Sequence, residues 1–209
     1  PDYDAVIFDE AHQIEDVATR FFGVSVSDAA IERLARDAAH APIALGSLIG
    51  SVRARADAFF EALPRGATRE GGRGALAREH FERGHGAATH HALDAALEAL
   101  ELAATRQAGE AEPILQLARR ARRGRDELGR VADPGSRHVR WIERSDHRVA
   151  VGASPVDVSG RFRGDVVQRV GTVVLTSATL TTGGSFAFLR QRLGIDFEVD
   201  EAILPSPFD

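Results

Sequence analysis

Residues 3–12 read YDAVIFDEAH, a short apolar run that leads directly into Asp9, Glu10 and His12. Consecutive apolar residues at positions 6–8 are typical of a strand that is covered on both faces in a parallel sheet. Polar groups at the carboxyl end of such a strand face the crevice in which open α/β sheets bind ligands. The stretch therefore predicts an α/β fold with a site at the end of this strand.

The side chains of residues 9–12 suit the hydrolysis of a nucleoside triphosphate. That reaction needs Mg²⁺ beside the β and γ phosphates, and a second group that positions the attacking water. Asp9 stands where a Walker B carboxylate supports the metal, and Glu10 stands where the water is oriented. His12 can hydrogen-bond a neighbouring element and report the nucleotide state. A plain strand followed by a polar helix start is the simpler alternative.

A second apolar run, GTVVLTSATL at residues 171–180, contains Ser177, Ala178 and Thr179. Hydroxyl residues after a strand are commonly turn formers, so this run alone is a weak signal. Together with the DEAH stretch, it predicts a strand edge that touches the phosphates or the side chains of residues 9–12.

The DEAH stretch is followed by an Ala- and Arg-rich middle and then by the segments WIERSDHRVAVGASPVDVS, VVLTSATLTTGGSFAFLRQRLGI and ILPSPFD. In this order, the segments resemble the DinG/XPD-like branch of superfamily 2 DNA helicases. The resemblance is tight over residues 3–27 and 141–209 and loose over residues 28–137. It implies part of a RecA-like motor domain with a parallel sheet, interrupted by an inserted α-helical, arch-like domain beside single-stranded DNA. The long separation of Asp9 from Ser177 leaves room for this domain and argues against an RNA-directed DEAH helicase.

The resemblance also implies a division of the chain and a function. Residues 1–26 would form the first part of the first motor domain, and residues 27–137 the arch-like insertion. Residues 138–200 would return to the first motor domain, and residues 201–209 would begin a second motor domain. The implied enzyme is an ATP-dependent DNA helicase, which couples Mg-ATP hydrolysis to movement on single-stranded DNA and to duplex unwinding in repair or replication. His12, Ser177, Ala178 and Thr179 would couple hydrolysis to DNA movement. A helical module that binds DNA or a partner without ATPase activity is the alternative.

Some parts of such an enzyme are missing from the sequence. No Gly-rich phosphate loop ending in Gly-Lys-Ser/Thr occurs, and all 26 Lys+Arg residues are Arg. The chain alone is therefore not expected to hydrolyse ATP. An iron–sulfur cluster stays open for a longer protein, because its cysteines would lie upstream and this chain has none. The absence of Met, initiator included, suits an internal fragment.

Charge and hydropathy limit the partners. A net charge of −5 restricts DNA contact to local basic patches. The candidate patch is Arg119, Arg120, Arg122 and Arg123, although a solvated helix face is the commoner reason for such a run. The apolar runs are too short to cross a bilayer, and no signal peptide is visible. We expect a cytoplasmic protein with ATP and single-stranded DNA as partners, and favour a monomer.

The middle of the chain is predicted to form an up-and-down bundle of four helices. Apolar residues at three- and four-residue spacing predict helices near residues 28–38, 45–63, 93–104 and from Pro113 onward, while residues 67–86 predict a loop. This region contains histidines at positions 80, 85, 90 and 91, but no cysteine accompanies them. Their spacing does not place a compact set of metal ligands on one helix face.

Elements on either side of the bundle are also predicted. Ile14, Val17, Ala18, Phe21 and Phe22 recur at helical spacing, which indicates a helix packed on the core. Further predictions are a hairpin over residues 139–151, a short helix over 160–168, a buried strand over 170–175 and a helix over 186–193 that Gly194 closes. A lone Trp, at position 141, is expected to be half-buried packing, with base stacking as the alternative.

Overall fold

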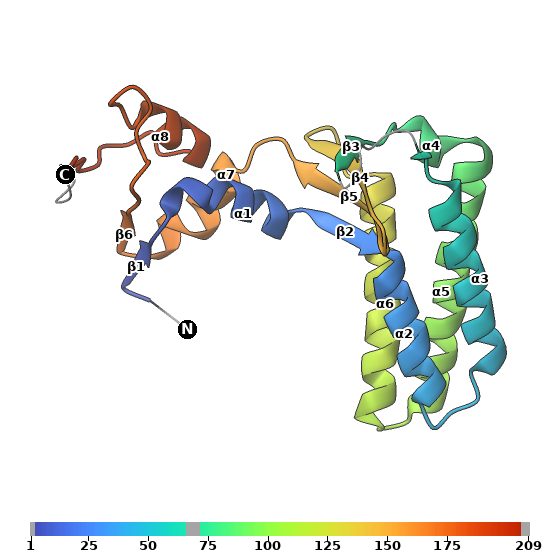
Figure 1. Ribbon diagram of the computed structural model, residues 1–209. Helices are drawn as coiled ribbons and strands as arrows, with labels where there is room; N and C mark the ends of the chain where they lie inside the picture. Colours follow the sequence, from blue (N-terminus) through green and yellow to red (C-terminus); the bar gives the residue numbers. More distant parts are fainter. Residues whose placement is uncertain (1–2, 66–71, 206–209) are drawn as a thin grey trace. The chain divides into compact units, whose positions relative to one another are not determined.

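The computed structural model describes residues 3–65 and 72–205, and the chain divides into two compact units (Figure 1). Unit 1 is formed by Pro1–Phe22 and Pro155–Asp209, and unit 2 by Gly23–Ser154. The sequence predicts domain boundaries near residues 26 and 137. The observed divisions differ because strands on both sides of the helical region pair with one another. Of the predicted start of a second motor domain, residues 201–205 are described and residues 206–209 lie outside the described residues.

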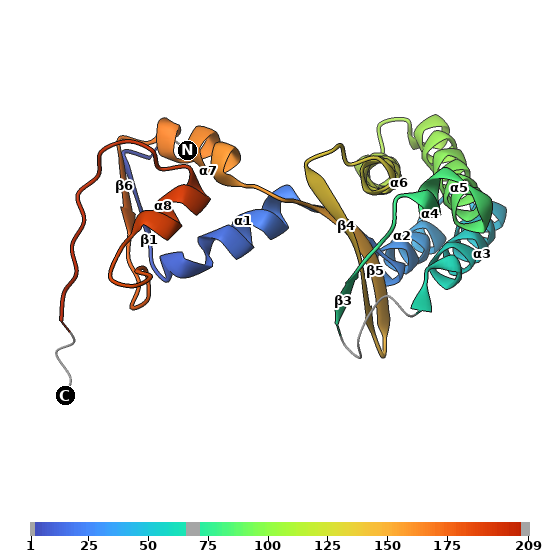
Figure 2. The ribbon, with the colours of Figure 1, turned by 90° about the horizontal axis from the view of Figure 1, so that it is seen from above.

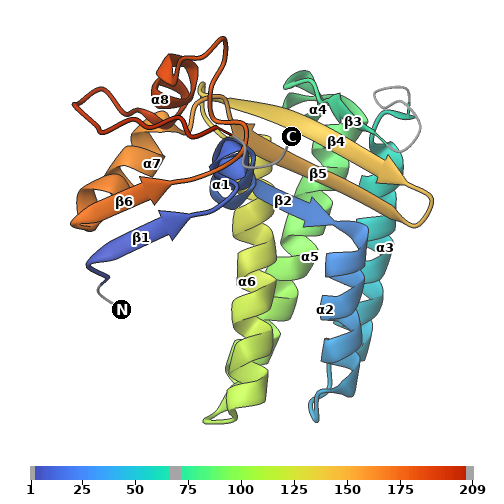
Figure 3. The same cartoon turned by 60° about the vertical axis from the view of Figure 1, so that its left-hand side comes forward.

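Unit 1 has a mixed α/β fold built on two parallel strands, as predicted. Strand β1 (Ala5–Phe8) pairs with β6 (Thr172–Leu175) in a register that sets Phe8 opposite Leu175 (Figure 3). The helices of this unit are η1 (Ala11–Gln13), α1 (Ile14–Phe22), α7 (Ser159–Asp165), η3 (Val167–Arg169) and α8 (Ala187–Leu193). Ala11, Ile14, Phe162 and Leu193 form its buried core.

Apolar coverage in unit 1 is one-sided, which corrects two predictions. Phe8 and Leu175 pack against the core, whereas Ile7 on the other face of β1 is 70% exposed. The predicted coverage of both strand faces is therefore wrong for the described residues. Phe21 of α1 is likewise 80% exposed, and Val17 is exposed too. Ile14 and Ala18 of α1 are buried and lie one turn apart, on one face of the helix. Only this face packs against the small core.

Unit 2 contains the predicted bundle. Its long helices are α2 (Asp28–His40), α3 (Gly46–Ala62), α5 (Gly84–Ala108) and α6 (Glu112–Ala132). Figure 2 shows these helices grouped together, viewed nearly along their axes. Ser27 caps α2, since its hydroxyl accepts a hydrogen bond from the Ala30 amide at 3.2 Å. The largest fully buried side chains include Phe59, Leu93, Leu97, Leu100 and Leu128.

A four-stranded sheet completes unit 2. Its strands are β2 (Val24–Ser27), β3 (Arg73–Ala75), β4 (His138–Ser145) and β5 (Arg148–Pro155), in the spatial order β2-β5-β4-β3. The predicted hairpin is thus β4–β5. The predicted loop is wrong from residue 73 onward, where the chain forms β3, the short helix α4 (Glu79–Glu82) and the start of α5. Its remainder, within residues 66–71, lies outside the described residues.

Within residues 3–65 and 72–205, no helix is both long enough and apolar enough to span a membrane.

Candidate functional site

The two motifs of the sequence meet at the carboxyl ends of β1 and β6. The amide of Thr176 donates a hydrogen bond to the carbonyl oxygen of Phe8 at 2.8 Å, which extends the parallel pairing by one residue. The amide of Ala11 then donates to the carbonyl oxygen of Thr176 at 2.9 Å. Asp9 and Glu10 lie between these two bonds. Residues far apart in the sequence are therefore fixed beside one another by main-chain contacts.

A hydrogen-bonded triangle joins Glu10, His12 and Ser177. The Ser177 hydroxyl donates to Glu10 Oε2 at 3.1 Å, and Ser177 Oγ lies 2.8 Å from His12 Nδ1. His12 Nδ1 also lies 3.1 Å from Glu10 Oε2. Because the hydroxyl proton points to Glu10, His12 Nδ1 must carry a proton for its contact with Ser177 to be a hydrogen bond. The predicted coupling residues His12 and Ser177 are thus in direct contact.

The other predicted coupling residues contribute less. The Thr179 amide donates to Ser177 Oγ at 3.3 Å, so the backbone after the strand turns around the serine hydroxyl. Over the described part of the chain, neither the Thr179 side chain nor Ala178 makes a hydrogen bond or ion pair with Glu10 or His12.

The carboxylate of Asp9 accepts two hydrogen bonds. Its Oδ1 accepts a hydrogen bond from the Glu10 amide at 2.9 Å and another from the Thr176 hydroxyl at 3.0 Å. Thr176 is a contact that sequence reasoning missed, although it directly precedes Ser177. The only available signal was a hydroxyl residue at a strand end, which a turn explains equally well.

The backbone of Glu10 is strained. Its φ of 50° and ψ of 42° lie in the left-handed region, and no other non-glycine residue in the described ranges has a positive φ. Such a conformation costs about 1–3 kcal/mol and persists only where the surroundings impose it. The hydrogen bonds on both sides of residues 9 and 10 impose it here.

The donor set fits Mg²⁺ of the kind that accompanies a nucleotide. No cluster of three or more His, Cys, Asp or Glu side chains suited to a metal occurs within the described residues. Mg²⁺ at nucleotide sites needs only one or two carboxylates, because phosphates and waters supply the remaining ligands. Asp9 is exposed, and its Oδ2 makes no hydrogen bond with any described residue. Asp9 can therefore act as the single carboxylate of such a site.

The arginine run of α6 divides into paired and unpaired side chains. Arg119 lies 2.8 Å from Glu112, and Arg120 pairs with Asp37 of α2. Arg122 and Arg123 have no ion pair among the described residues, and both line a shallow depression of about 300 Å³ on α6. Of the four predicted DNA contacts, these two have no ion pair within the described residues, although the acidic Asp126 and Glu127 line the same depression.

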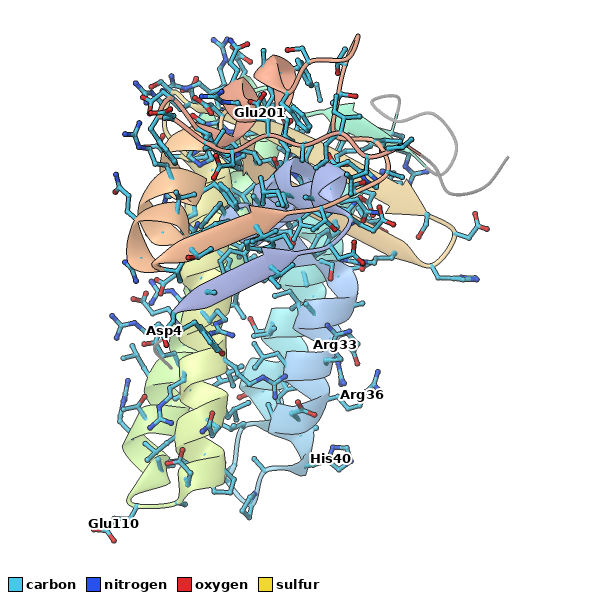
Figure 4. All side chains as sticks on the ribbon, turned by 90° about the vertical axis from the view of Figure 1, so that its left-hand side faces the viewer. Asp4, Arg33, Arg36, His40, Glu110 and Glu201 are labelled. Carbon is cyan, nitrogen blue, oxygen red and sulfur yellow. The ribbon has the colours of Figure 1, made fainter. Side chains whose placement is uncertain are left out.

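Arginines from α2 extend this basic surface. A groove of about 340 Å³ between α2 and α6 is lined by Arg33, Arg120 and Arg123 together with Glu127. Figure 4 shows Arg33 and Arg36 projecting from one side of α2. Burial raises the pKa of Glu127, while the charges of Arg123 and Arg130 oppose that rise.

The histidines of unit 2 do not form a metal cluster among the described residues. His90 is buried on α5, where its ring packs 5.5 Å from that of Phe81 and 6.2 Å from that of Phe59. Burial lowers the pKa of His90 and also that of His80. These two rings therefore belong to the packing of the bundle.

Comparison with known proteins finds relatives among bacterial DNA helicases, whereas no family model matches. "ATP-dependent DNA helicase YoaA" of Escherichia coli is 29% identical over 219 residues, covering 100% of this chain and 33% of that protein. The YoaA of Haemophilus influenzae is 24% identical over 217 residues, again with 33% of that protein covered. "3'-5' exonuclease DinG" of Bacillus subtilis is 40% identical over 73 residues, covering 32% of this chain and 8% of that protein.

The chain spans about a third of the length of the YoaA relatives, which extend over all of it. The predicted resemblance is thereby confirmed. The chain that joins the DEAH and SAT segments is thus similar over its whole length to the bacterial proteins named ATP-dependent DNA helicase YoaA, and over part of its length to the protein named 3'-5' exonuclease DinG.

Proposed function

We propose that this chain is the part of an ATP-dependent DNA helicase that supplies the Walker B side chains for ATP hydrolysis and couples hydrolysis to movement on single-stranded DNA. The observation that supports the proposal most directly is the triangle of Glu10, His12 and Ser177 at the carboxyl ends of two parallel strands. Its position is where open α/β sheets bind ligands. The names of the YoaA relatives, which include ATP dependence and DNA, support the same function.

Asp9 and Glu10 take separate roles in this proposal. Asp9 would hold Mg²⁺, and bound Mg²⁺ would supply the charge neutralisation that phosphoryl transfer requires. Glu10 orients the attacking water through its carboxylate, which is exposed and anchored on one side by the Ser177 hydroxyl. The left-handed backbone of Glu10 turns its side chain out of the strand direction.

His12 and Ser177 link the two strand ends. Loss of the γ phosphate changes the charge near Glu10, and the Ser177 hydroxyl and His12 Nδ1 both contact Glu10 Oε2. A shift of Glu10 therefore moves the segment that follows β6. We propose this movement as the route by which hydrolysis acts on DNA, with Ala178 and Thr179 carried along by the backbone.

Unit 2 supplies the proposed DNA contact. Arg122 and Arg123 of α6 and Arg33 of α2 offer guanidinium groups along a groove, the arrangement that suits a chain of phosphates. This unit would correspond to the arch-like insertion, and unit 1 to part of the first motor domain. We further propose a monomer that acts in the cytoplasm in DNA repair.

Hydrolysis by the complete gene product, with and without single-stranded DNA, tests the proposal. Glu10→Gln removes the negative charge but keeps the shape, so we expect turnover to fall by about 10²–10⁴-fold while nucleotide and DNA binding persist. Glu61→Gln is the matched control, because Glu61 of α3 is exposed and is in no ion pair among the described residues.

The outcomes separate the two functions that the sequence leaves open. DNA-stimulated turnover that disappears in Glu10→Gln supports the motor. Unaltered turnover in that variant contradicts the role of Glu10. A wild-type protein that binds DNA in a salt-sensitive way but hydrolyses no ATP is instead a binding module.

A further inference from the structure

Thr176 contacts the loop after β1 through three different groups. Its amide donates to the Phe8 carbonyl at 2.8 Å, its carbonyl accepts from the Ala11 amide at 2.9 Å, and its hydroxyl donates to Asp9 Oδ1 at 3.0 Å. The first and second bonds fix the main chain before and after Asp9 and Glu10. The third bond fixes the carboxylate itself.

We propose that Thr176 is a positioning residue that orients the Asp9 carboxylate toward Mg²⁺, an inference that rests on the proposed nucleotide site. The hydroxyl bond and the Glu10 amide both use Oδ1, so the carboxylate plane is set by two donors. Oδ2, which has no hydrogen bond within the described residues, is then presented to the metal.

Outer partners of this kind have measurable effects on metal sites. A hydrogen bond to a ligating carboxylate fixes its rotamer, and loss of the partner typically lowers metal affinity or activity by about 10–100-fold. The bond is especially needed here because Asp9 is exposed, and no apolar packing restricts its side chain. Thr176 differs in role from Ser177, whose hydroxyl contacts Glu10 and His12 instead.

The plain alternative is that Thr176 only closes the turn. Its two main-chain bonds would do this with any side chain, and valine has nearly the same shape as threonine. Thr176→Val therefore removes the hydroxyl bond and leaves the main-chain bonds. Thr176→Ser keeps the hydroxyl. Thr172→Val makes the same chemical change on an exposed residue of β6, the strand that Thr176 follows, and serves as the control.

The experiment measures the affinity of the complete gene product for a non-hydrolysable, fluorescent ATP analogue, once with Mg²⁺ and once with EDTA. For Thr176→Val we expect the affinity in EDTA to be unchanged and the affinity gained from Mg²⁺ to fall about tenfold. Thr176→Ser should retain most of the gain, and Thr172→Val all of it. Hydrolysis is then measured at a range of Mg²⁺ concentrations, where Thr176→Val should need about ten times more Mg²⁺.

Each other outcome overturns a defined statement. An unchanged Mg²⁺ gain in Thr176→Val overturns the positioning role, as does an equal loss of affinity in both conditions, which indicates a general disturbance of the turn. A wild type whose nucleotide affinity is indifferent to Mg²⁺ overturns both this inference and the proposed function. A wild type that shows the Mg²⁺ gain and the Thr176 effect but no turnover overturns the proposed function alone.

Discussion

At the scale of the residue, Gly152 of β5 shows how an absent side chain shapes unit 2. A Cβ at this position would lie 2.2 Å from Trp141 Cζ2 and 2.5 Å from the carbonyl oxygen of Val24. The indole Nε1 donates to Ser154 Oγ at 2.9 Å, and the Arg73 guanidinium lies 3.8 Å from the ring centroid. Trp141 is therefore half-buried packing, the first of the two alternatives that its sequence context offers.

Gly152→Ala should destabilise the protein by about 1–3 kcal/mol, because the indole or the β2–β5 pairing must shift. Urea unfolding followed by far-UV circular dichroism measures the change. Gly129→Ala is the control, since Gly129 is exposed in α6 and its Cβ would meet nothing within 4 Å. This control should gain about 0.5–1 kcal/mol from helix propensity. Equal unfolding midpoints for Gly152→Ala and the wild type would show that the close contact yields easily.

At the scale of the element, α6 carries two kinds of arginine. Arg125 faces α5, where its guanidinium lies 3.2 Å from Asp94, 3.0 Å from Glu98 and 3.2 Å from Glu101. These acids follow one another at three- and four-residue spacing, so one face of α5 receives one arginine. Arg122 and Arg123 lie elsewhere on α6 without such partners. The arginine run of α6 therefore forms ion pairs with α5 on one face of the helix, whereas on another face the side chains of Arg122 and Arg123 have no ion pair within the described residues.

The double variant Arg122→Gln/Arg123→Gln should weaken binding to single-stranded DNA. We expect the slope of log affinity against log salt concentration to become shallower by about 1.4, because each lost phosphate contact on a single strand removes about 0.7. Fluorescence anisotropy over a salt series measures it. Arg125→Gln is the control that should keep the slope and cost about 1 kcal/mol of stability. An unchanged slope in the double variant would exclude these two arginines from the DNA contact.

At the scale of the whole molecule, the sequence predicts the elements that have a periodic apolar pattern. It does not predict elements that depend on partners far along the chain. The helices of unit 2 follow from apolar spacing and from caps such as Ser27. Strand β3 could not be predicted, because its three residues have no pattern and its partner β4 lies far along the chain. Exposure of Ile7 and Phe21 was missed because apolar residues do not reveal which faces the chain itself covers. The contact between the two motifs was predicted, except for that of Thr176, while the roles of the site residues stay predictions.

The pH dependence of folding should reflect two histidines of unit 2, the buried His90 and the partly buried His80. Burial lowers the pKa of His80 and His90 below the ordinary value of 6.5, and Asp94 opposes the shift at His90 only in part. Their neutral forms thus favour the folded state, so stability is complete above about pH 6.5 and declines as the pH falls below it. Glu127, whose pKa is raised by burial, acts in the opposite direction nearer its ordinary value of 4.5.

Urea unfolding from about pH 7.5 to about 5.5, followed by Trp141 fluorescence, measures this decline. His90→Phe should reduce the slope, because phenylalanine can pack with Phe59 and Phe81 but binds no proton. His147→Gln, in the exposed β4–β5 turn, should leave the slope as it is. A slope that is the same in His90→Phe and the wild type would contradict the prediction.

The pairing of Val24 with Ala153 has a consequence for protein synthesis. Thr176 emerges from the ribosome 167 residues after Asp9, a delay on the order of 10–30 s at usual rates of translation. During that time β1 has no partner strand, and its main-chain groups are unpaired. Unit 2 is contiguous and has its own core, so it can fold first and join its own ends. The nascent loop between β1 and β6 is then short, and its closure loses less entropy.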